Sequence, residues 1–228
     1  MKDRVTLLLN FICSTKGRFE FLEKNTPNVA KVIGKWPCIV NFDIENEYTE
    51  KVRKLYESNF QNLIFENEVG TLWCDWMIEK LENIETPYVL YPIEDVEFFD
   101  IFTHKILNQM LIDMKKFDVK HLLFGKVQKY RDILLKGRGN KDTEARHFWY
   151  HESSNSPYQQ NSLTISALFE RDFLLAKVKE VKPNKNTVKV LDNFERLGIK
   201  GQKINSAIPN KVYIGVPKNN PPMERRRG

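Results

Sequence analysis

The sequence predicts a single α/β domain with a mainly parallel sheet, helices on its faces and a small antiparallel addition. Through about the first hundred residues, short apolar runs alternate with amphipathic segments in the order β-α-β-α-β-α-β. This alternation with short connections favours parallel strands joined by right-handed crossovers. Polar or acidic residues follow several of the apolar runs. They would lie at the carboxyl ends of the strands, where open α/β sheets bind their ligands.

The composition is that of a globular protein. The 228 residues suffice for one large domain with a sizeable core, and no apolar run reaches the length of a membrane span. The first apolar run has no small-residue cleavage site after it, so we expect a strand and not a signal peptide. Three cysteines, Cys13, Cys38 and Cys74, lie far apart inside apolar runs. They predict buried thiols in a reducing, cytoplasmic compartment, and neither a disulfide framework nor a zinc site.

The basic charge is concentrated at the carboxyl end of the chain. The formal net charge is +6, and four cations and one acid after Pro217 contribute half of it. Residues 218–228 have no apolar period, which predicts a disordered basic tail or part of a linker outside a domain formed by residues 1–217. Such a tail can make peripheral contact with anionic lipid, but it is more often a solvated end.

The first predicted strand leads into a polar turn and a helix. Residues 5–12 form a β-rich apolar run, and a helix is expected over about residues 18–24. Ser14 or Thr15 can cap that helix. A strand, a Ser/Thr/Gly turn and a helix N-terminus place backbone N–H groups where a phosphate can lie.

Acidic residues follow two further predicted strands. The apolar run 36–43 ends at Asp43, and the run 88–93 leads directly into Glu94, Asp95 and Glu97. Carboxylates crowded at the end of an interior strand repel one another unless a divalent cation or a cationic substrate is bound, and oxygen ligands suit Mg²⁺ or Mn²⁺. The alternative is that these acids lie in an ordinary solvated loop.

The remaining elements follow from periodicity. Helices are predicted over residues 48–58, 69–84, 100–116, 127–135, 171–180 and 187–197, and strands over 63–65, 119–124, 163–169, 203–208 and 211–215. The polar stretch 137–161 is expected to be a lid or binding loop. It contains His147 and His151, which have the spacing of a metal-binding pair only if the segment is helical.

Several common enzyme motifs are absent from the sequence. There is no GxGxxG or GxxxxGK[ST] for a nucleotide-binding loop of those classes, and no GxSxG for a serine hydrolase. A nucleic-acid partner is not expected, because the predicted crevice is lined by acids that repel phosphates.

With these features in place, the chain resembles a GT-A-type glycosyltransferase of the broad family-2-like group. The resemblance covers about residues 4 to 216. Its most specific part is the segment 88–99, which is similar to the "YVLHLEDDWEFF"-like form of the family's acidic metal-binding motif. The other parts are the first strand and turn (5–21), the second strand ending in an acid (40–43), and three shorter segments. These are an acceptor-side strand at 166–173, an acid-bearing helix segment at 192–195 and an "HIG"-like strand at 212–215.

The resemblance implies transfer of a sugar from a nucleotide-sugar donor to the hydroxyl of a glycan or other acceptor, with Mn²⁺ or Mg²⁺ as cofactor. It implies that Asp95 and Glu97 bind the metal, with Glu94 beside them. Ser14, Thr15, Arg18 and Asp43, together with Glu94, would bind the donor. Asp192 or Glu195 would act as the catalytic base, and Trp149 and Tyr150 would offer flat faces to the acceptor.

The sequence departs from the family pattern at two positions. Val96 stands where a second aspartate is common, and Tyr213 stands where many members have a metal-binding histidine. These departures leave open a metal-independent transferase. They also leave open a protein of another class, a non-catalytic nucleotide- or glycan-binding module with a degenerate metal motif.

Overall fold

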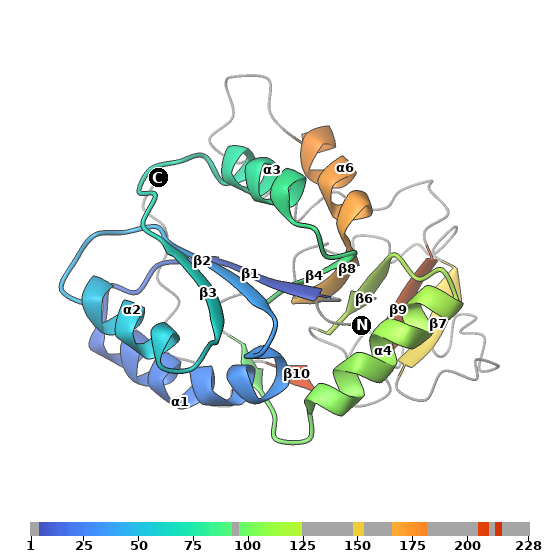
Figure 1. Cartoon of the computed structure of the whole chain (residues 1–228), viewed down its shortest axis with the longest axis horizontal. Helices are drawn as coiled ribbons and strands as arrows, with labels where there is room; N and C mark the ends of the chain where they lie inside the picture. Colours follow the sequence, from blue (N-terminus) through green and yellow to red (C-terminus); the bar gives the residue numbers. More distant parts are fainter. Residues whose placement is uncertain are drawn as a thin grey trace.

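The structure is a computed structural model, drawn in Figure 1. It describes residues 5–92, 96–124, 148–152, 166–181, 205–209 and 213–215. For residues 148–152, 181 and 205–209 the backbone alone is described. The predicted helices at 127–135 and 187–197, most of the polar stretch 137–161 and the basic tail lie outside these residues.

An eight-stranded mixed sheet forms the centre of the molecule, in the order β3-β2-β1-β4-β8-β6-β9-β7. The pairs β1–β2, β2–β3, β1–β4 and β6–β9 are parallel, whereas β8 and β7 run against their neighbours. The predicted fold class, a mainly parallel sheet with an antiparallel addition, is therefore confirmed. The strands are β1 (Val5–Phe11), β2 (Pro37–Phe42), β3 (Asn62–Glu66), β4 (Tyr88–Tyr91), β6 (His121–Leu123), β7 (Phe148–Glu152), β8 (Ala167–Glu170) and β9 (Asn205–Pro209).

Helices cover both faces of the sheet (Figure 1). One face carries α1 (Lys16–Ile33), α2 (Thr49–Glu57) and α4 (His104–Lys116), and the other carries α3 (Trp73–Asn83) and α6 (Arg171–Val181). Successive residues of β1 pack into the two cores in turn, because side chains alternate across a strand: Leu7 and Leu9 face α1, and Leu8 faces α3. All seven residues of β1 are buried, as expected for an interior parallel strand.

Helix α1 is longer than the sequence predicts. The expected helix ends near Lys24, before Pro27, but α1 continues to Ile33 with Pro27 inside it. Pro27 lies on the exposed side, while Leu22, Val29, Val32 and Ile33 are buried against the sheet. This buried apolar stripe outweighs the lost hydrogen bond at proline, because tertiary packing supplies most helix stability in proteins.

The polar stretch around the two histidines contains a strand. We expected residues 137–161 to be a lid or binding loop, but residues 148–152 form β7, which pairs with β9 in antiparallel register. Trp149, Tyr150 and His151 therefore belong to the edge of the sheet. The alternation of apolar and polar residues in so short a run was too weak to separate a strand from an aromatic loop.

A small second sheet joins two segments that are distant in sequence. Strand β5 (Glu97–Phe98) pairs antiparallel with β10 (Ile214–Gly215), and the backbone N–H of Phe99 donates to the carbonyl oxygen of Tyr213 at 3.0 Å. The end of the acidic motif thus lies beside the last strand in the described part of the chain.

The three cysteines are buried, as predicted, and their thiols are free. Among the described residues, no helix has both the length and the apolar character needed to cross a bilayer.

Candidate functional site

The candidate residues that follow β1 and β2 meet at one edge of the sheet. These two strands are adjacent and parallel, so their carboxyl ends lie together. The backbone N–H of Asp43 donates to the carbonyl oxygen of Phe11 at 2.9 Å, which continues the pairing one step beyond the strands. The structure therefore brings the turn that holds Ser14 and Thr15 close to Asp43. We refer to this edge as the rim.

The N-terminus of α1 opens onto the rim. Thr15 is the N-cap: its backbone is extended and its hydroxyl oxygen accepts from the backbone N–H of Arg18 at 3.3 Å. Ser14, Thr15 and Lys16 are exposed. The first turn of a helix presents N–H groups and a partial positive charge, so this end of α1 suits an anion such as a phosphate.

Arg18 has a different position from its neighbours, because its side chain is only 5% exposed. The guanidinium lies 5.9 Å from the ring centre of Phe21, and its charge lowers the pKa of Tyr56 on α2. Burial raises the pKa of the Tyr56 hydroxyl, and the positive charge of Arg18 opposes that rise. Arg18 therefore places a buried positive charge in the first turn of α1, next to the turn that holds Ser14 and Thr15. A contact between Arg18 and a donor stays a prediction.

Asp43 is held by the loop that joins β3 to α3. The backbone N–H of Gly70 donates to Oδ1 of Asp43 at 3.1 Å. In the amide orientation that satisfies both of its polar atoms, the side chain of Asn67 donates to the carbonyl oxygens of Phe42 and Ile44, the two residues that flank Asp43. The carboxylate is thus bracketed by residues 67–70 and has a fixed orientation at the end of β2.

Two asparagines inside the sheet hold this loop in turn. Asn41, only 1% exposed, accepts from the backbone N–H of Glu68 at 2.8 Å and donates to the carbonyl oxygen of Glu68 at 3.4 Å. Its amide also donates to Oδ1 of Asn10 on β1 at 3.3 Å. Asn10 and Asn41 are partners in the parallel register. These bonds satisfy polar groups within an otherwise apolar sheet and fix the first residues after β3.

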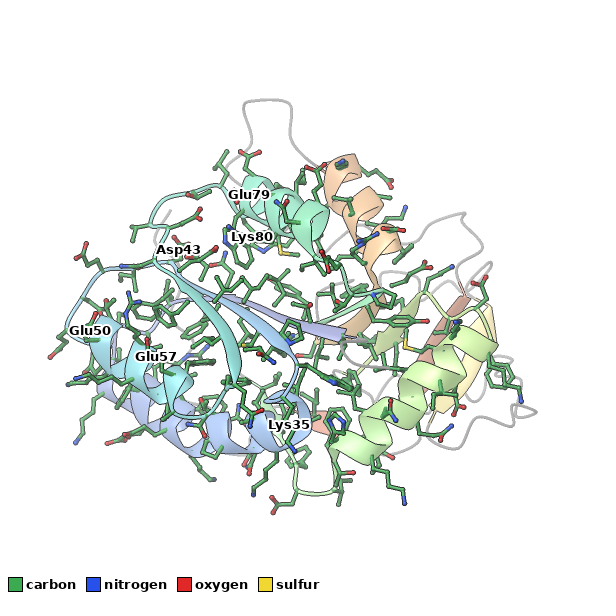
Figure 2. The ribbon with its side chains drawn as sticks, viewed as in Figure 1. Lys35, Asp43, Glu50, Glu57, Glu79 and Lys80 are labelled. Carbon is green, nitrogen blue, oxygen red and sulfur yellow. The ribbon has the colours of Figure 1, made fainter. Side chains whose placement is uncertain are left out.

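A nearly buried lysine anchors the same loop from α3. Lys80 Nζ lies 2.7 Å from Glu66, 2.8 Å from Glu79 and 3.4 Å from Glu68, and its side chain is 10% exposed. Burial by itself lowers the pKa of Lys80, but its hydrogen bonds to Glu66 and Glu79 and the charges around it raise the pKa overall. Figure 2 shows Lys80 and Glu79 on α3, and Asp43 at the upper end of β2.

The segment after β4 is fixed by Asn25 of α1. The Asn25 amide donates to the carbonyl oxygen of Val96 at 2.8 Å, and its oxygen accepts from the backbone N–H of Phe98 at 3.0 Å. Val96 is 2% exposed and lines a small pocket with Leu9, Phe11, Val29 and Tyr56. Val96 therefore faces the core, at the position where GT-A-type glycosyltransferases commonly have a second aspartate.

The two other residues compared with metal ligands also have partners in the protein. Glu97 on β5 forms an ion pair with Lys24 of α1 at 3.7 Å. Tyr213 is 1% exposed, its ring centre lies 5.3 Å from that of Phe102, and burial raises the pKa of its hydroxyl. Tyr213 is thus a core residue, at the position where many GT-A-type glycosyltransferases have a histidine.

Several predicted site residues are not placed by the structure. Glu94, Asp95, Asp192 and Glu195 lie outside the described residues, and for Trp149 and Tyr150 only the backbone is described. Within the described part of the chain, no group of three or more histidine, cysteine or acidic side chains could hold a metal ion. A divalent cation would therefore need at least one ligand from outside the described residues or from a bound molecule.

The sequence analysis did not identify three asparagines with structural roles around the site: Asn10 and Asn41, which hold the loop after β3, and Asn25, which holds the segment after β4. A signal was present for two of them. Asn10 and Asn41 each stand near the carboxyl end of an otherwise apolar run, and in a parallel pair such positions lie side by side. A buried polar side chain in a central strand needs a partner, which is a reason to look for one across the strands.

Comparison with solved structures finds the same fold over nearly the whole chain. S. aureus TarS 1–349 is 15% identical with a TM-score of 0.57, and the match covers 95% of this chain and 60% of that one. The same protein in complex with UDP-GlcNAc is also 15% identical, with a TM-score of 0.57 and coverage of 94% and 58%. The mannosyltransferase PcManGT from Pyrobaculum calidifontis, in complex with GDP-Man and Mn²⁺, is 12% identical with a TM-score of 0.51. That match covers 96% of this chain and 59% of the mannosyltransferase.

The chain thus spans about 60% of the length of each of these three structures. No protein-family model matches the sequence, and no curated protein matches it either. At this level of identity the likeness shows the fold, which is that of GT-A-type glycosyltransferases, as the resemblance implied.

Proposed function

We propose that this chain, with its GT-A-type fold, is a glycosyltransferase domain that moves a sugar from a nucleotide-sugar to an acceptor hydroxyl. The observation that carries the proposal is the hydrogen bond from the backbone N–H of Gly70 that orients the carboxylate of Asp43. A carboxylate whose orientation is fixed by Gly70 N–H stands at the rim beside the exposed N-terminus of α1. A fixed hydrogen-bond acceptor next to an anion-binding helix end matches the two ends of a nucleoside diphosphate.

The donor roles follow from this arrangement. Asp43 accepts hydrogen bonds from the nucleoside, and the turn with Ser14 and Thr15 donates backbone N–H groups to the diphosphate. The positive charge of Arg18, close behind the turn, makes the same place favourable for an anion. The TarS and PcManGT complexes with UDP-GlcNAc and GDP-Man support a nucleotide-sugar as the class of donor.

Glu94 and Asp95, with Glu97 nearby, are the proposed ligands of Mn²⁺ or Mg²⁺. When bound, such a cation offsets the charge that develops on the leaving diphosphate. The presence of Mn²⁺ in the PcManGT complex supports this cofactor. Because Glu97 is paired with Lys24, we assign it a weaker role than Asp95.

Acceptor activation is assigned to an acid in the segment 192–195. A carboxylate there, Asp192 or Glu195, would remove the proton from the acceptor hydroxyl as the new bond forms. Trp149 and Tyr150, on the edge strand β7, would provide flat apolar faces for a sugar ring.

A second candidate function is a binding module that keeps the fold and does not catalyse transfer. The orientation of Val96 and Tyr213 favours it, because both side chains are buried in the core and neither can contribute a metal ligand. The two functions share the donor site and differ in turnover.

A thermal-shift screen with and without Mn²⁺ tests the proposal, because a ligand that binds the native state raises its melting temperature. The screen uses UDP, GDP and a panel of nucleotide-sugars, and the ligands that bind are then tested for transfer or hydrolysis. A stabilising donor that is turned over supports the transferase. A donor that stabilises the protein and is never consumed supports the binding module.

A further inference from the structure

Asn46 connects the two loops that form the rim. It lies in the segment between β2 and α2, three residues after Asp43, and its side-chain amide donates to the carbonyl oxygen of Cys13 at 2.9 Å. Cys13 directly precedes Ser14 in the turn after β1 and is fully buried. The two loops that carry Ser14, Thr15 and Asp43 are thus joined by a side-chain bond beyond the ends of the strands.

The oxygen of the Asn46 carboxamide forms a local hydrogen bond. It accepts from the backbone N–H of Tyr48 at 2.8 Å. The backbone N–H of Asn46 donates to the hydroxyl of Thr49 at 3.0 Å, and the N–H of Thr49 donates to the carbonyl oxygen of Asn46 at 3.2 Å. These bonds form the turn that starts α2. Asn46 therefore makes a local bond through its oxygen and a bond between loops through its nitrogen.

An aromatic contact also joins the segment after β2 to α1, in addition to the bond between Asn46 and Cys13. The ring of Tyr48 stacks on that of Phe19 in the first turn of α1, with centres 5.7 Å apart and an interplanar angle of 30°. Tyr48 is 9% exposed. Because the backbone N–H of Tyr48 donates to Asn46, the residue that makes this ring contact with α1 is itself bonded to Asn46.

We propose that Asn46 is a positioning residue for donor binding, which sets the distance and angle between the α1 turn and Asp43. This inference rests on the proposed function. A ligand that contacts both loops binds more tightly when their separation is fixed beforehand, because less conformational freedom is lost on binding. Asn46 itself then needs no contact with the donor.

Asn46→Ser separates the two tasks of the side chain. A serine hydroxyl can accept from the backbone N–H two residues later, as in common serine turns, so the start of α2 is retained. It is too short to reach Cys13, and it adds no charge that would repel a phosphate. One hydrogen bond is lost, so the melting temperature should fall about as far as in the control variant described next. The affinity for UDP or GDP should also become about three- to tenfold weaker.

Asn59→Ser is the matched control. Asn59 donates from its amide to the carbonyl oxygen of Leu55 at 2.7 Å, at the far end of α2. Losing that bond affects stability alone, so its nucleotide affinity should equal that of the wild type. In transfer assays, Asn46→Ser should raise the donor KM by the same factor as the affinity loss and leave kcat unchanged, whereas a merely structural defect would reduce the active fraction and so lower kcat.

Hydrogen exchange without nucleotide gives a second measurement. Residues 13–18 should exchange faster in Asn46→Ser than in the wild type and in Asn59→Ser, because their connection to the β2 loop is gone. A wild type that binds neither nucleotide nor nucleotide-sugar overturns the proposed function and this inference with it. A wild type that binds, together with unchanged affinity or unchanged exchange in Asn46→Ser, overturns the inference alone.

Discussion

The carboxylate of Asp43 accepts a hydrogen bond from the backbone N–H of Gly70, 27 residues away in sequence, at 3.1 Å. Gly70 adopts φ of +79°, a backbone conformation that residues with a Cβ rarely adopt. The direction of the Asp43 carboxylate is therefore set by a turn that requires glycine. Because one carboxylate oxygen is held by the backbone, the other is presented in a fixed direction at the rim.

Replacing Gly70 by alanine should weaken nucleotide binding. No atom lies within 4 Å of an added Cβ, so the cost is the left-handed backbone itself, about 1–2 kcal/mol. The turn relieves this cost by moving, and Asp43 loses its partner. We expect UDP or GDP affinity to fall by about tenfold in calorimetric titration.

Gly34→Ala is the control for this change. A Cβ at Gly34 would lie 2.6 Å from the carbonyl oxygen of Ala30, so the backbone must shift and the melting temperature should fall. Gly34 is the C-cap of α1, at the opposite end from the rim. Its nucleotide affinity should be that of the wild type, and an equal loss in both variants would contradict a specific role for the Gly70 turn.

Replacing Lys80 by methionine should lower stability by about 2 kcal/mol. The change leaves Glu66, whose side chain is 18% exposed, without its cation. This figure is below the usual range for a buried pair, because Glu68 and Glu79 are more exposed and screened by water. Lys179→Met is the comparison: its ion pair with Glu82 at 2.6 Å is half exposed on both sides and should contribute less than about 1 kcal/mol.

The contribution of Lys80 should also depend on pH. Its pKa in the folded state is raised above the ordinary value of 10.5, so the folded state holds this proton more tightly than the unfolded state does. The stability it provides is complete below about pH 10.5 and declines as the pH rises from there through the folded pKa. In denaturant unfolding, the difference between wild type and Lys80→Met should shrink above that pH. A constant difference up to pH 11.5 would contradict this account.

Much of the fold follows from local sequence signals, and the exceptions have physical causes. The apolar runs 5–12 and 36–43 contain the observed strands β1 and β2, because strands buried on both faces are continuously apolar. The run 100–116 contains α4, because a helix with one buried face repeats its apolar residues every three to four positions. Helix α1 was predicted too short, since the proline signal is local and the packing of Val29 and Val32 on the sheet is not.

The candidate site was only partly predictable. Acids and a Ser/Thr turn after parallel strands predict a shared edge, and the structure brings Thr15 and Asp43 to it. The bonds that hold Asp43 and the segment after β4 join distant residues: Gly70 and Asp43 are 27 positions apart, and Phe98 and Asn25 are 73 apart. Such partners depend on strand order and register, which no local pattern specifies.

Asp95→Asn should remove the Mn²⁺-dependent part of nucleotide affinity. The amide keeps the size of the carboxylate but binds a hard cation much less well. Calorimetric titration of UDP or GDP with and without Mn²⁺ measures the difference, and Asp100→Asn, an exposed acid nearby, is the control. An unchanged Mn²⁺ effect in folded Asp95→Asn would exclude Asp95 as a ligand.

Asp192→Asn and Glu195→Gln test the assignment of the base. If one of them accepts the acceptor proton, its amide variant should turn over about 10²–10⁴-fold more slowly, while donor affinity holds. Asp192 is the stronger candidate, because its shorter side chain has fewer rotatable bonds. Single-turnover transfer separates the two effects. Wild-type turnover in both variants would show that neither acid is the catalytic base.

The most direct measurement for the whole account is the affinity of wild type, Asp43→Ala and Glu45→Ala for UDP and GDP. Glu45 is an exposed acid in the same loop and controls for the loss of negative charge. The account predicts that the wild type binds at least one of the two nucleotides at a single site. It predicts that Asp43→Ala binds about tenfold or more weakly and that Glu45→Ala binds as the wild type does. A wild type that binds neither nucleotide, or Asp43→Ala with full affinity, would contradict the assignment of the rim as a donor site.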